Sequence, residues 1–451
     1  MTMIDNMIVR ARSAVKEVSN YSQNQVDEMV KVCGKVVYDN AKELAIEAVE
    51  ETQFGAVKPK TMKNSYVPAV LWQDLKGKKS VGVLSEDKEE GIIKIAHPVG
   101  VVGAITPVTV PNICPMGNAM LALKGRNAII ISPHPKAKKS SKHTVDLMRE
   151  GLVKIGAPAD LIQIVEEPTT ALSQEVMSKC DVAVATGGPG LVKAAYSSGK
   201  PAYGVGAGNS QVIVDEIDDF AQFAQDTIVS RSYDNGTACV CAQALIYKES
   251  LEEKLKDALS KAGAFIVDDV VTVDKIREVL FVDGHFNAEM VGQDAQAIAQ
   301  AAQIDVPAST TVLMLLTSKY GHDEILCDEK MCPVMLGYSY RDLDEALDIV
   351  LANYEVKGKG HTAGIYSNND DYIRKAGIKL PVSRLMVNQP TTDAGGGPHN
   401  SLAPTTSLGC GSWGNNSLTE NLTFTHLLNI QSLTYPIDKE VKAYNDPSVW
   451  D

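Results

Sequence analysis

The chain has 451 residues, of which 44% are hydrophobic, 22% charged and 6% aromatic, a composition typical of a globular protein and not of a disordered or fibrous one. Asp and Glu total 56 against 43 Lys and Arg, so the formal net charge is −13. Without a basic stripe, this acidic balance argues against nucleic acid or an anionic membrane surface as the main partner. A chain of this length exceeds one hydrophobic core, so two or three domains are expected.

The cysteine pattern and the absence of long apolar runs indicate the compartment. Eight cysteines are scattered without a Cys-x-x-Cys pair, which favours buried thiols over a disulfide framework or a zinc site. The first residues lack a signal-peptide core, and no apolar run is long enough to span a membrane. We therefore expect a cytoplasmic protein, free or within a metabolic compartment, without membrane or metal.

In chain order, the first fifty residues predict helices, with a capping box at Ser22 and Gln25 opening the second. Short β-branched runs follow at 80–84, 92–96 and 99–105. Strands and helices then alternate, with strands at 128–132, 161–165, 182–185 and 211–214 and helices at 139–155, 172–179 and 191–197. This alternation predicts a parallel sheet with right-handed crossovers.

A second alternating series follows a helix near 220–229. Its predicted strands are 242–247, 264–267, 311–316, 363–366 and 385–387, and its helices are 251–261 and 343–351. The expected fold class is therefore α/β, with two Rossmann-like domains divided near residue 225. Residues 1–225 form the first, residues 226–415 the second, and residues 416–451 a C-terminal tail.

The segment from Asp234 to Cys241 carries the clearest chemical signal. It places an Asn-Gly turn between a helix and a strand, with Cys239 just beyond the turn. A thiol at such a corner lies near backbone N–H groups, which stabilise the nucleophilic thiolate. For a lone cysteine, the alternative is a small buried hydrophobe without chemistry.

Seven further segments decide between these interpretations. Together with Asn235-Gly236-x-x-Cys239, they resemble the aldehyde dehydrogenase superfamily, especially its CoA-acylating branch. The likeness covers nearly the whole chain, and the segments occur in family order at 100–107, 132–139, 186–190, 204–209, 329–334, 360–363 and 408–414. The resemblance is greatest to CoA-dependent succinate-semialdehyde dehydrogenases and to the acylating half of bifunctional aldehyde/alcohol dehydrogenases. It implies Cys239 as nucleophile in a catalytic domain, and NAD or NADP bound by the first domain.

The resemblance also implies the cofactor site. Its residues would be Thr106, Pro107, His134, Pro135, Lys136, Gly187, Gly188, Gly206 and Glu329. NAD-preferring relatives carry a Glu where this chain has Ala137, and three lysines lie nearby at positions 136, 138 and 139. NADP is therefore as plausible as NAD, although these lysines could equally be a solvated first turn. Glu329 matches the carboxylate that holds the nicotinamide ribose.

The second substrate is inferred from a missing residue. Aldehyde dehydrogenases that release free acid carry a general-base Glu where this chain has Val205. Without that base, water attacks a thioacyl enzyme slowly, so a thiol such as coenzyme A is expected to complete the turnover. His361 matches a proton carrier of acylating relatives, with a hydrogen-bonded loop histidine as the alternative. Thr109 could help hold the oxyanion.

The predicted reaction is the reversible oxidation of a small, weakly polar aldehyde of two to four carbons to an acyl-CoA. Val110 and Ala242 depart from the branch's usual residues, and the apolar stretch 66–70 lacks the cation that a succinate-semialdehyde enzyme should offer. Succinate semialdehyde and sulfoacetaldehyde remain alternative substrates. A phosphate-using acyl-phosphate reductase and a Cys-dependent acyltransferase remain alternative activities. The resemblance further implies a homodimer or homotetramer assembled through the strands at 80–96 and the tail.

Overall fold

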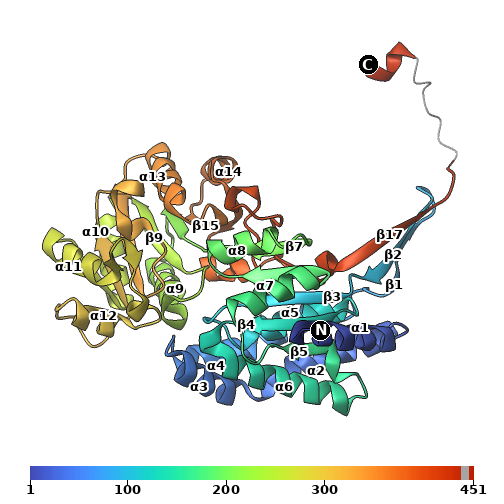
Figure 1. Ribbon diagram of the computed structural model, residues 1–451. Helices are drawn as coiled ribbons and strands as arrows, with labels where there is room; N and C mark the ends of the chain where they lie inside the picture. Colours follow the sequence, from blue (N-terminus) through green and yellow to red (C-terminus); the bar gives the residue numbers. More distant parts are fainter. Residues whose placement is uncertain (438–445) are drawn as a thin grey trace.

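The computed structural model describes residues 1–437 and 446–451. It shows two α/β lobes side by side and a narrow antiparallel sheet that extends away from them (Figure 1). Residues 438–445 of the expected C-terminal segment lie outside the described residues. None of the helices that the structure describes combines the length and the hydropathy needed to cross a membrane.

The chain begins with helices that pack against the first lobe. They are α1 (Met3–Glu17), α2 (Gln23–Asp39), α3 (Ala41–Thr52) and α4 (Val57–Leu75). The predicted capping box is present at the start of α2, where the Ser22 side chain accepts from Gln25 N and the Gln25 side chain accepts from Ser22 N. One face of α2 is buried through Val26, Met29 and Val30.

The first lobe contains a parallel five-stranded sheet in the order β5-β4-β3-β6-β7. Its strands are β3 (Val101–Thr106), β4 (Ala128–Pro133), β5 (Ile162–Ile164), β6 (Val182–Thr186) and β7 (Ala202–Val205). Its connecting helices are α5 (Ile113–Lys124), α6 (Lys138–Lys154), α7 (Thr170–Lys179) and α8 (Pro189–Tyr196). Because successive strands are added on opposite sides of β3, a crevice opens beyond the carboxyl ends of β3 and β6.

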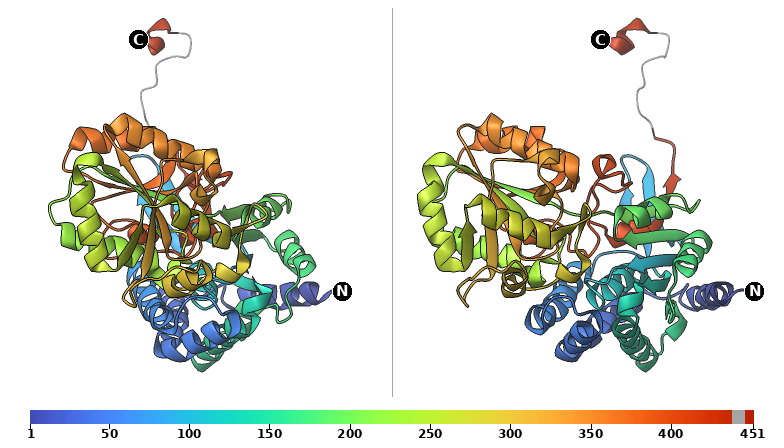
Figure 2. Two further views of the ribbon diagram at one scale, coloured as in Figure 1. Left: turned by 90° about the vertical axis from the view of Figure 1, so that its left-hand side faces the viewer. Right: turned by 60° about the vertical axis from the view of Figure 1, so that its left-hand side comes forward.

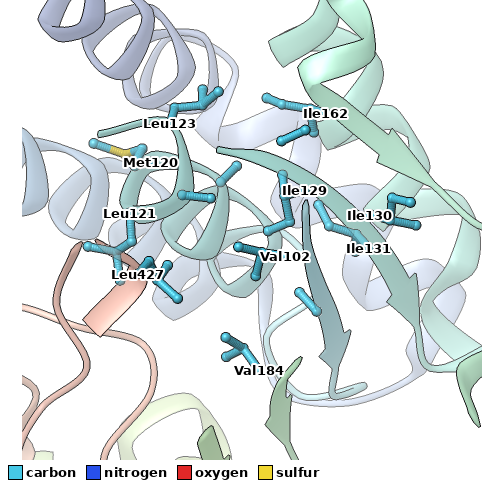
Figure 3. Close-up of a cluster of buried hydrophobic side chains, with 14 of the residues drawn as sticks. Val102, Met120, Leu121, Leu123, Ile129, Ile130, Ile131, Ile162, Val184 and Leu427 are labelled. Atoms are coloured by element: carbon cyan, nitrogen blue, oxygen red, sulfur yellow. The ribbon is translucent and has the colours of Figure 1, made fainter. Parts of the chain in front are cut away.

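The core of the first lobe explains why its strands read as continuous apolar runs. Side chains of β3, β4, β5 and β6 meet those of α5 in one buried cluster, including Val102, Ile129, Ile162 and Val184 (Figure 3). Both faces of a parallel sheet are covered by helices, so alternation between apolar and polar residues disappears. Leu427, far along the chain, joins the same cluster (Figure 3).

The second lobe contains a parallel seven-stranded sheet in the order β10-β13-β14-β9-β8-β15-β16. Its strands are β8 (Ser210–Val214), β9 (Ala242–Lys248), β10 (Ala264–Val267), β13 (Val312–Leu316), β14 (Val334–Tyr340), β15 (Gly360–Tyr366) and β16 (Val382–Val387). Its helices are α9 (Phe220–Ser232), α10 (Glu252–Ala262), α11 (Val270–Leu280), α12 (Ala295–Ala301), α13 (Leu343–Val356) and α14 (Asp370–Lys379). A short hairpin joins β11 (Phe281–Val282) to β12 (His285–Phe286).

The chain changes sheet between Val205, the last residue of β7, and Ser210, the first residue of β8. The predicted division near residue 225 lies later, inside α9. The sequence of β8 is a buried apolar strand like those before it, and only its pairing with β9 and β15 assigns it to the second sheet.

The extending sheet is antiparallel and consists of β1 (Gly82–Asp87), β2 (Ile92–Pro98) and β17 (Leu428–Thr434). It pairs the strands expected at 80–96 with the C-terminal segment. The right view of Figure 2 shows it extending from the first lobe. Ile430 and Leu433 of β17 are exposed there.

Candidate active site

A cavity of about 730 Å³ lies between the two lobes. The carboxyl ends of β3, β4, β6 and β7 form one side, and the loop before β9 forms the other. Helix α4 closes one end through Lys63, Tyr66, Val67, Val70 and Leu71. Its position beyond the strand ends of the first sheet is the place where open α/β sheets bind ligands.

Cys239 lies on the predicted turn between α9 and β9, and it lines this cavity. Asp234 and Asn235 adopt left-handed conformations, with φ of 49° and 54°, which Asn and Asp tolerate better than other side chains. The buried Arg231 side chain holds the turn by donating to the carbonyl oxygens of Ala242, at 2.9 Å, and Lys330, at 2.6 Å. The turn therefore presents Cys239 from a fixed corner.

The environment of Cys239 agrees with a nucleophile that is activated only during reaction. Of the eight free cysteines, it is the one with intermediate burial, and the other seven are buried. Burial, followed by the nearby Glu329 charge, raises the pKa of the Cys239 thiol above its ordinary value. Within the described structure, the Cys239 backbone N–H donates to no protein acceptor. It is therefore free to bind a developing oxyanion.

Thr109 lies on the same cavity wall. The Lys60 ammonium donates to its backbone carbonyl oxygen over 3.1 Å, which fixes this loop to α4. The predicted oxyanion partners, Thr109 and the Cys239 N–H, thus come from opposite lobes and meet at one cavity.

A buried charge cluster supports the Cys239 turn from behind. The Asp234 carboxylate accepts from both the Lys60 ammonium, at 2.9 Å, and the Lys63 ammonium. All three side chains are at most 5% exposed. Two ammonium groups share one carboxylate, and Lys63 also lines the cavity. No sequence motif connects residues 60–63 with residue 234, so the sequence alone does not predict this cluster.

Most of the predicted cofactor residues line the cavity together. They are Thr106, Pro107, His134, Pro135, Gly187, Gly188, Gly206 and Glu329. The Thr106 hydroxyl is buried and has no hydrogen-bond partner, and the backbone at Gly188 and Gly206 has open space where a Cβ would stand. An unpaired polar group and bare backbone along a cavity wall suit a dinucleotide that approaches closely.

Lys136 is the predicted cofactor residue that lies outside this wall. Its side chain is exposed, and it does not line the cavity. Of its neighbours, Lys138 pairs with Glu167. The first N–H groups of α6, at Lys139 and Ser140, donate to the Glu51 carboxylate at 2.8 Å each. The Glu51 carboxylate therefore caps the N-terminus of α6. The N–H groups at this helix end are thus already paired, although this end was expected to face the adenosine part of the cofactor.

Glu329 lines the same cavity as Cys239. The Gly208 N–H donates to its Oε1 atom over 3.2 Å. Burial raises the pKa of Glu329 to about 7, against the opposing effects of Lys357 and this hydrogen bond. Glu329 therefore exchanges a proton near neutral pH.

Val205 lies at the end of β7 on the cavity wall, where it is 2% exposed. An apolar side chain at this place neither binds nor activates a water molecule. The position that matches the general-base Glu of acid-releasing relatives thus lies on the cavity wall without a basic side chain.

His361 does not line the cavity. It is the second residue of β15 and is fully buried, because the strand carries it into the sheet. Its Nδ1 atom lies 2.9 Å from the Thr362 hydroxyl, and its Nε2 atom has no partner. Burial and the nearby Arg384 lower the pKa of His361 to about 3. The imidazole is therefore neutral at physiological pH.

The model of the aldehyde dehydrogenase family matches residues 2–275 of this chain. The chain belongs to the aldehyde dehydrogenase family. Succinate-semialdehyde dehydrogenase (acetylating) of Clostridium kluyveri is 50% identical over 447 residues, which cover 99% of this chain and 98% of that relative. The family resemblance expected from the sequence segments is confirmed.

Solved structures agree with this aldehyde dehydrogenase fold. An acetylating aldehyde dehydrogenase from Geobacillus thermoglucosidasius has a TM-score of 0.94 at 37% identity, covering 98% of each chain. A propionaldehyde dehydrogenase of Rhodopseudomonas palustris, solved with bound CoA and an acylated cysteine, has a TM-score of 0.86 at 26% identity, covering 96% of this chain and 97% of that chain. The predicted α/β fold class is confirmed.

Proposed function

We propose that this aldehyde dehydrogenase is CoA-acylating and converts a small aldehyde of two to four carbons, reversibly, to its acyl-CoA with NAD or NADP. The observation that carries the proposal is the pairing of Cys239 with Val205 in one cavity. A nucleophilic thiol is present, and the position of the water-activating base is apolar. Related proteins that are named acetylating, or solved with CoA and an acylated cysteine, support the same assignment.

In this mechanism, Cys239 Sγ attacks the aldehyde carbon, and the Cys239 N–H and the Thr109 hydroxyl hold the resulting oxyanion. Gly187, Gly188 and Glu329 would hold the cofactor, which would supply the hydride acceptor. Loss of hydride leaves an acyl group on Cys239 as a thioester. The thiol of coenzyme A then displaces Cys239 and releases the acyl-CoA.

His361 stays a candidate proton carrier for the thiol exchange. Its unpartnered Nε2 atom has one free site for a proton. Because the buried imidazole has a pKa of about 3, it would act as a neutral donor or acceptor rather than as a stored proton. The imidazole would also need access to the cavity, and its buried position in β15 prevents this access.

We place the aldehyde at the end of the cavity that α4 closes, and we call it the aldehyde end. This end favours a substrate with a second, anionic group. Two ammonium groups at Lys60 and Lys63 share the single carboxylate of Asp234. The cluster thus has one more ammonium group than carboxylates, and Lys63 is its member on the cavity wall. Tyr66, Val67 and Val70 of the apolar stretch 66–70 line the cavity, and Lys63, one turn earlier on α4, supplies the cation that the stretch lacks. A short aldehyde with a distal carboxylate or sulfonate fits this end better than an uncharged one.

One assay tests the activity and the substrate class together. The purified protein would receive succinate semialdehyde, sulfoacetaldehyde, acetaldehyde and butyraldehyde, each with NAD or NADP and with CoA, phosphate or no acceptor. We expect absorbance at 340 nm to rise only with CoA, and fastest with the two anionic aldehydes. A rise with phosphate would instead support an acyl-phosphate reductase, and no rise with any aldehyde would support an acyltransferase.

We further propose a cytoplasmic homodimer or homotetramer, free or within a metabolic compartment. The exposed apolar side chains of β17, including Ile430 and Leu433, lie on a sheet that extends from the body of the molecule. Such a surface is suited to pairing with another copy. Light scattering of the purified protein tests the assembly.

A further inference from the structure

The Cys239 thiol must lose its proton to react, yet burial keeps its pKa above the ordinary value. Two other positions cannot take this proton. Position 205 carries a valine, which has no basic group, and the His361 side chain does not line the cavity. Among the described residues that line the cavity, Glu329 is the single carboxylate.

Gly208 connects Glu329 with Cys239. A Cβ atom at Gly208 would collide with the Cys239 carbonyl oxygen, so the two backbones are in direct contact. The same Gly208 donates its N–H to Glu329 Oε1 over 3.2 Å. One oxygen of the carboxylate is thereby held by the residue that contacts the Cys239 backbone, and the Glu329 charge acts on the Cys239 thiol. The other oxygen, Oε2, receives no hydrogen bond from the residues that the structure describes.

Burial and the surrounding charges together set the pKa of each group. Burial, the largest influence, raises the pKa of Glu329, and Asp328 adds to this effect, while Lys357 and Arg231 lower it. Burial and then the Glu329 charge itself raise the pKa of the Cys239 thiol most, Cys410 and Cys241 add to this effect, and Arg384 lowers it. The balance leaves Glu329 with a pKa of about 7, near the optimum for a general base in neutral solution.

We propose that Glu329 Oε2 accepts the proton of the Cys239 thiol as the sulfur attacks the aldehyde. The proposal rests on the function proposed above and adds a proton-transfer role to a residue otherwise expected to hold the cofactor ribose.

The atoms and charges of this step balance. The S–H bond breaks and an O–H bond forms on Glu329, while the S–C bond forms and the carbonyl electron pair moves to oxygen. Coenzyme A later returns its own thiol proton to Cys239. Glu329 then releases its proton to solvent, which accounts for the one proton that the overall oxidation produces.

The test is the rate at which iodoacetamide alkylates Cys239 without aldehyde, CoA or cofactor. In the protein without substitutions, we expect the alkylation rate to rise with pH through an inflection near pH 7, as Glu329 ionises. In Glu329→Gln, the inflection should disappear and the rate at pH 7.5 should fall at least tenfold. Asp328→Asn, next in sequence and paired with Lys357 at 2.6 Å, is the matched control: it should keep the inflection but move it to lower pH, because the Asp328 charge raises the pKa of Glu329.

Two results would overturn the proposal. Faster alkylation of Glu329→Gln at neutral pH would show that Glu329 merely repels the thiolate. A profile of the unmodified protein without an inflection between pH 6 and 8 would exclude the proton transfer even if the variant did not fold. Because this assay uses no substrate, it separates failure of the proton transfer from failure of the aldehyde panel.

Discussion

The two ends of the active-site cavity both lie near lysines, but the lysines behave differently. At the cofactor end, the sequence shows a cluster at positions 136–139, yet Lys138 pairs with Glu167 and Glu51 caps the adjoining helix. At the aldehyde end, Lys60 and Lys63 belong to no motif, yet they share one buried carboxylate. The two ends therefore differ in burial: Lys136, Lys139 and the Lys138–Glu167 pair are exposed or partly exposed, whereas Lys60, Lys63 and Asp234, which the sequence did not mark, are buried.

This difference shows that a run of lysines predicts a local field only when its counter-charges are known. Glu51 and Glu167 come from separate elements and are brought to the run by folding. Surface pairs of this kind also contribute little binding energy, because water screens them. In the buried Asp234 cluster screening is weak, so one unbalanced ammonium has a larger effect.

The largest expected effect follows from removing the Cys239 thiol, on which the proposed mechanism depends. Cys239→Ala removes the atom that attacks the aldehyde, so CoA-dependent formation of NAD(P)H should fall below detection. Cys241→Ala, two residues away and fully buried, is the control and should retain most of the activity. Substantial aldehyde oxidation by Cys239→Ala would refute the proposed mechanism at both ends.

Next in size is the loss of the carboxylate from the aldehyde-end cluster. Asp234→Asn leaves Lys60 and Lys63 buried without their counter-charge, which we expect to lower the free energy of unfolding by about 3–5 kcal/mol. Urea denaturation followed by circular dichroism measures it. Asp74→Asn, in an exposed pair with Lys78, should cost less than about 1 kcal/mol. Equal losses of unfolding free energy in the two variants would show that the buried Asp234 cluster contributes no more to stability than the exposed Asp74–Lys78 pair.

A smaller effect concerns selectivity between aldehydes. Lys63→Met should lower kcat/KM for succinate semialdehyde about tenfold to hundredfold, because a charged hydrogen bond contributes roughly 1.5–3 kcal/mol. The value for butyraldehyde should change little, and Lys63→Arg should restore part of the preference. Lys58→Met, an exposed lysine on the same helix, is the control. An unchanged ratio between the two aldehydes would remove the argument for an anionic substrate.

The smallest expected effect is at the cofactor end. Glu51→Gln removes a negative charge from the start of α6, so kcat/KM with NADP should rise a few-fold relative to NAD. Glu50→Gln, exposed and one residue earlier, should leave the ratio unchanged. If Glu51→Gln also leaves it unchanged, the lysine cluster and its counter-charges play no part in cofactor choice.

The sequence by itself determined the fold class, the family and the position of Cys239. These depend on local patterns: apolar runs alternating with amphipathic helices, and an Asn-Gly turn before the cysteine. Strands such as β7 and β14 were not predicted, because β7 is short and β14 is interrupted by Gly337. Their pairing with neighbouring strands stabilises them.

Only the tertiary structure decided how the side chains of the site are placed. The sequence marked Lys136 and His361, but strand and helix geometry leaves Lys136 at the surface and buries His361 within β15. It gave no signal for the contact of Lys60 and Lys63 with Asp234. Electrostatic effects depend on distance and burial in space, and residues more than 170 positions apart acquire both only when the lobes pack together.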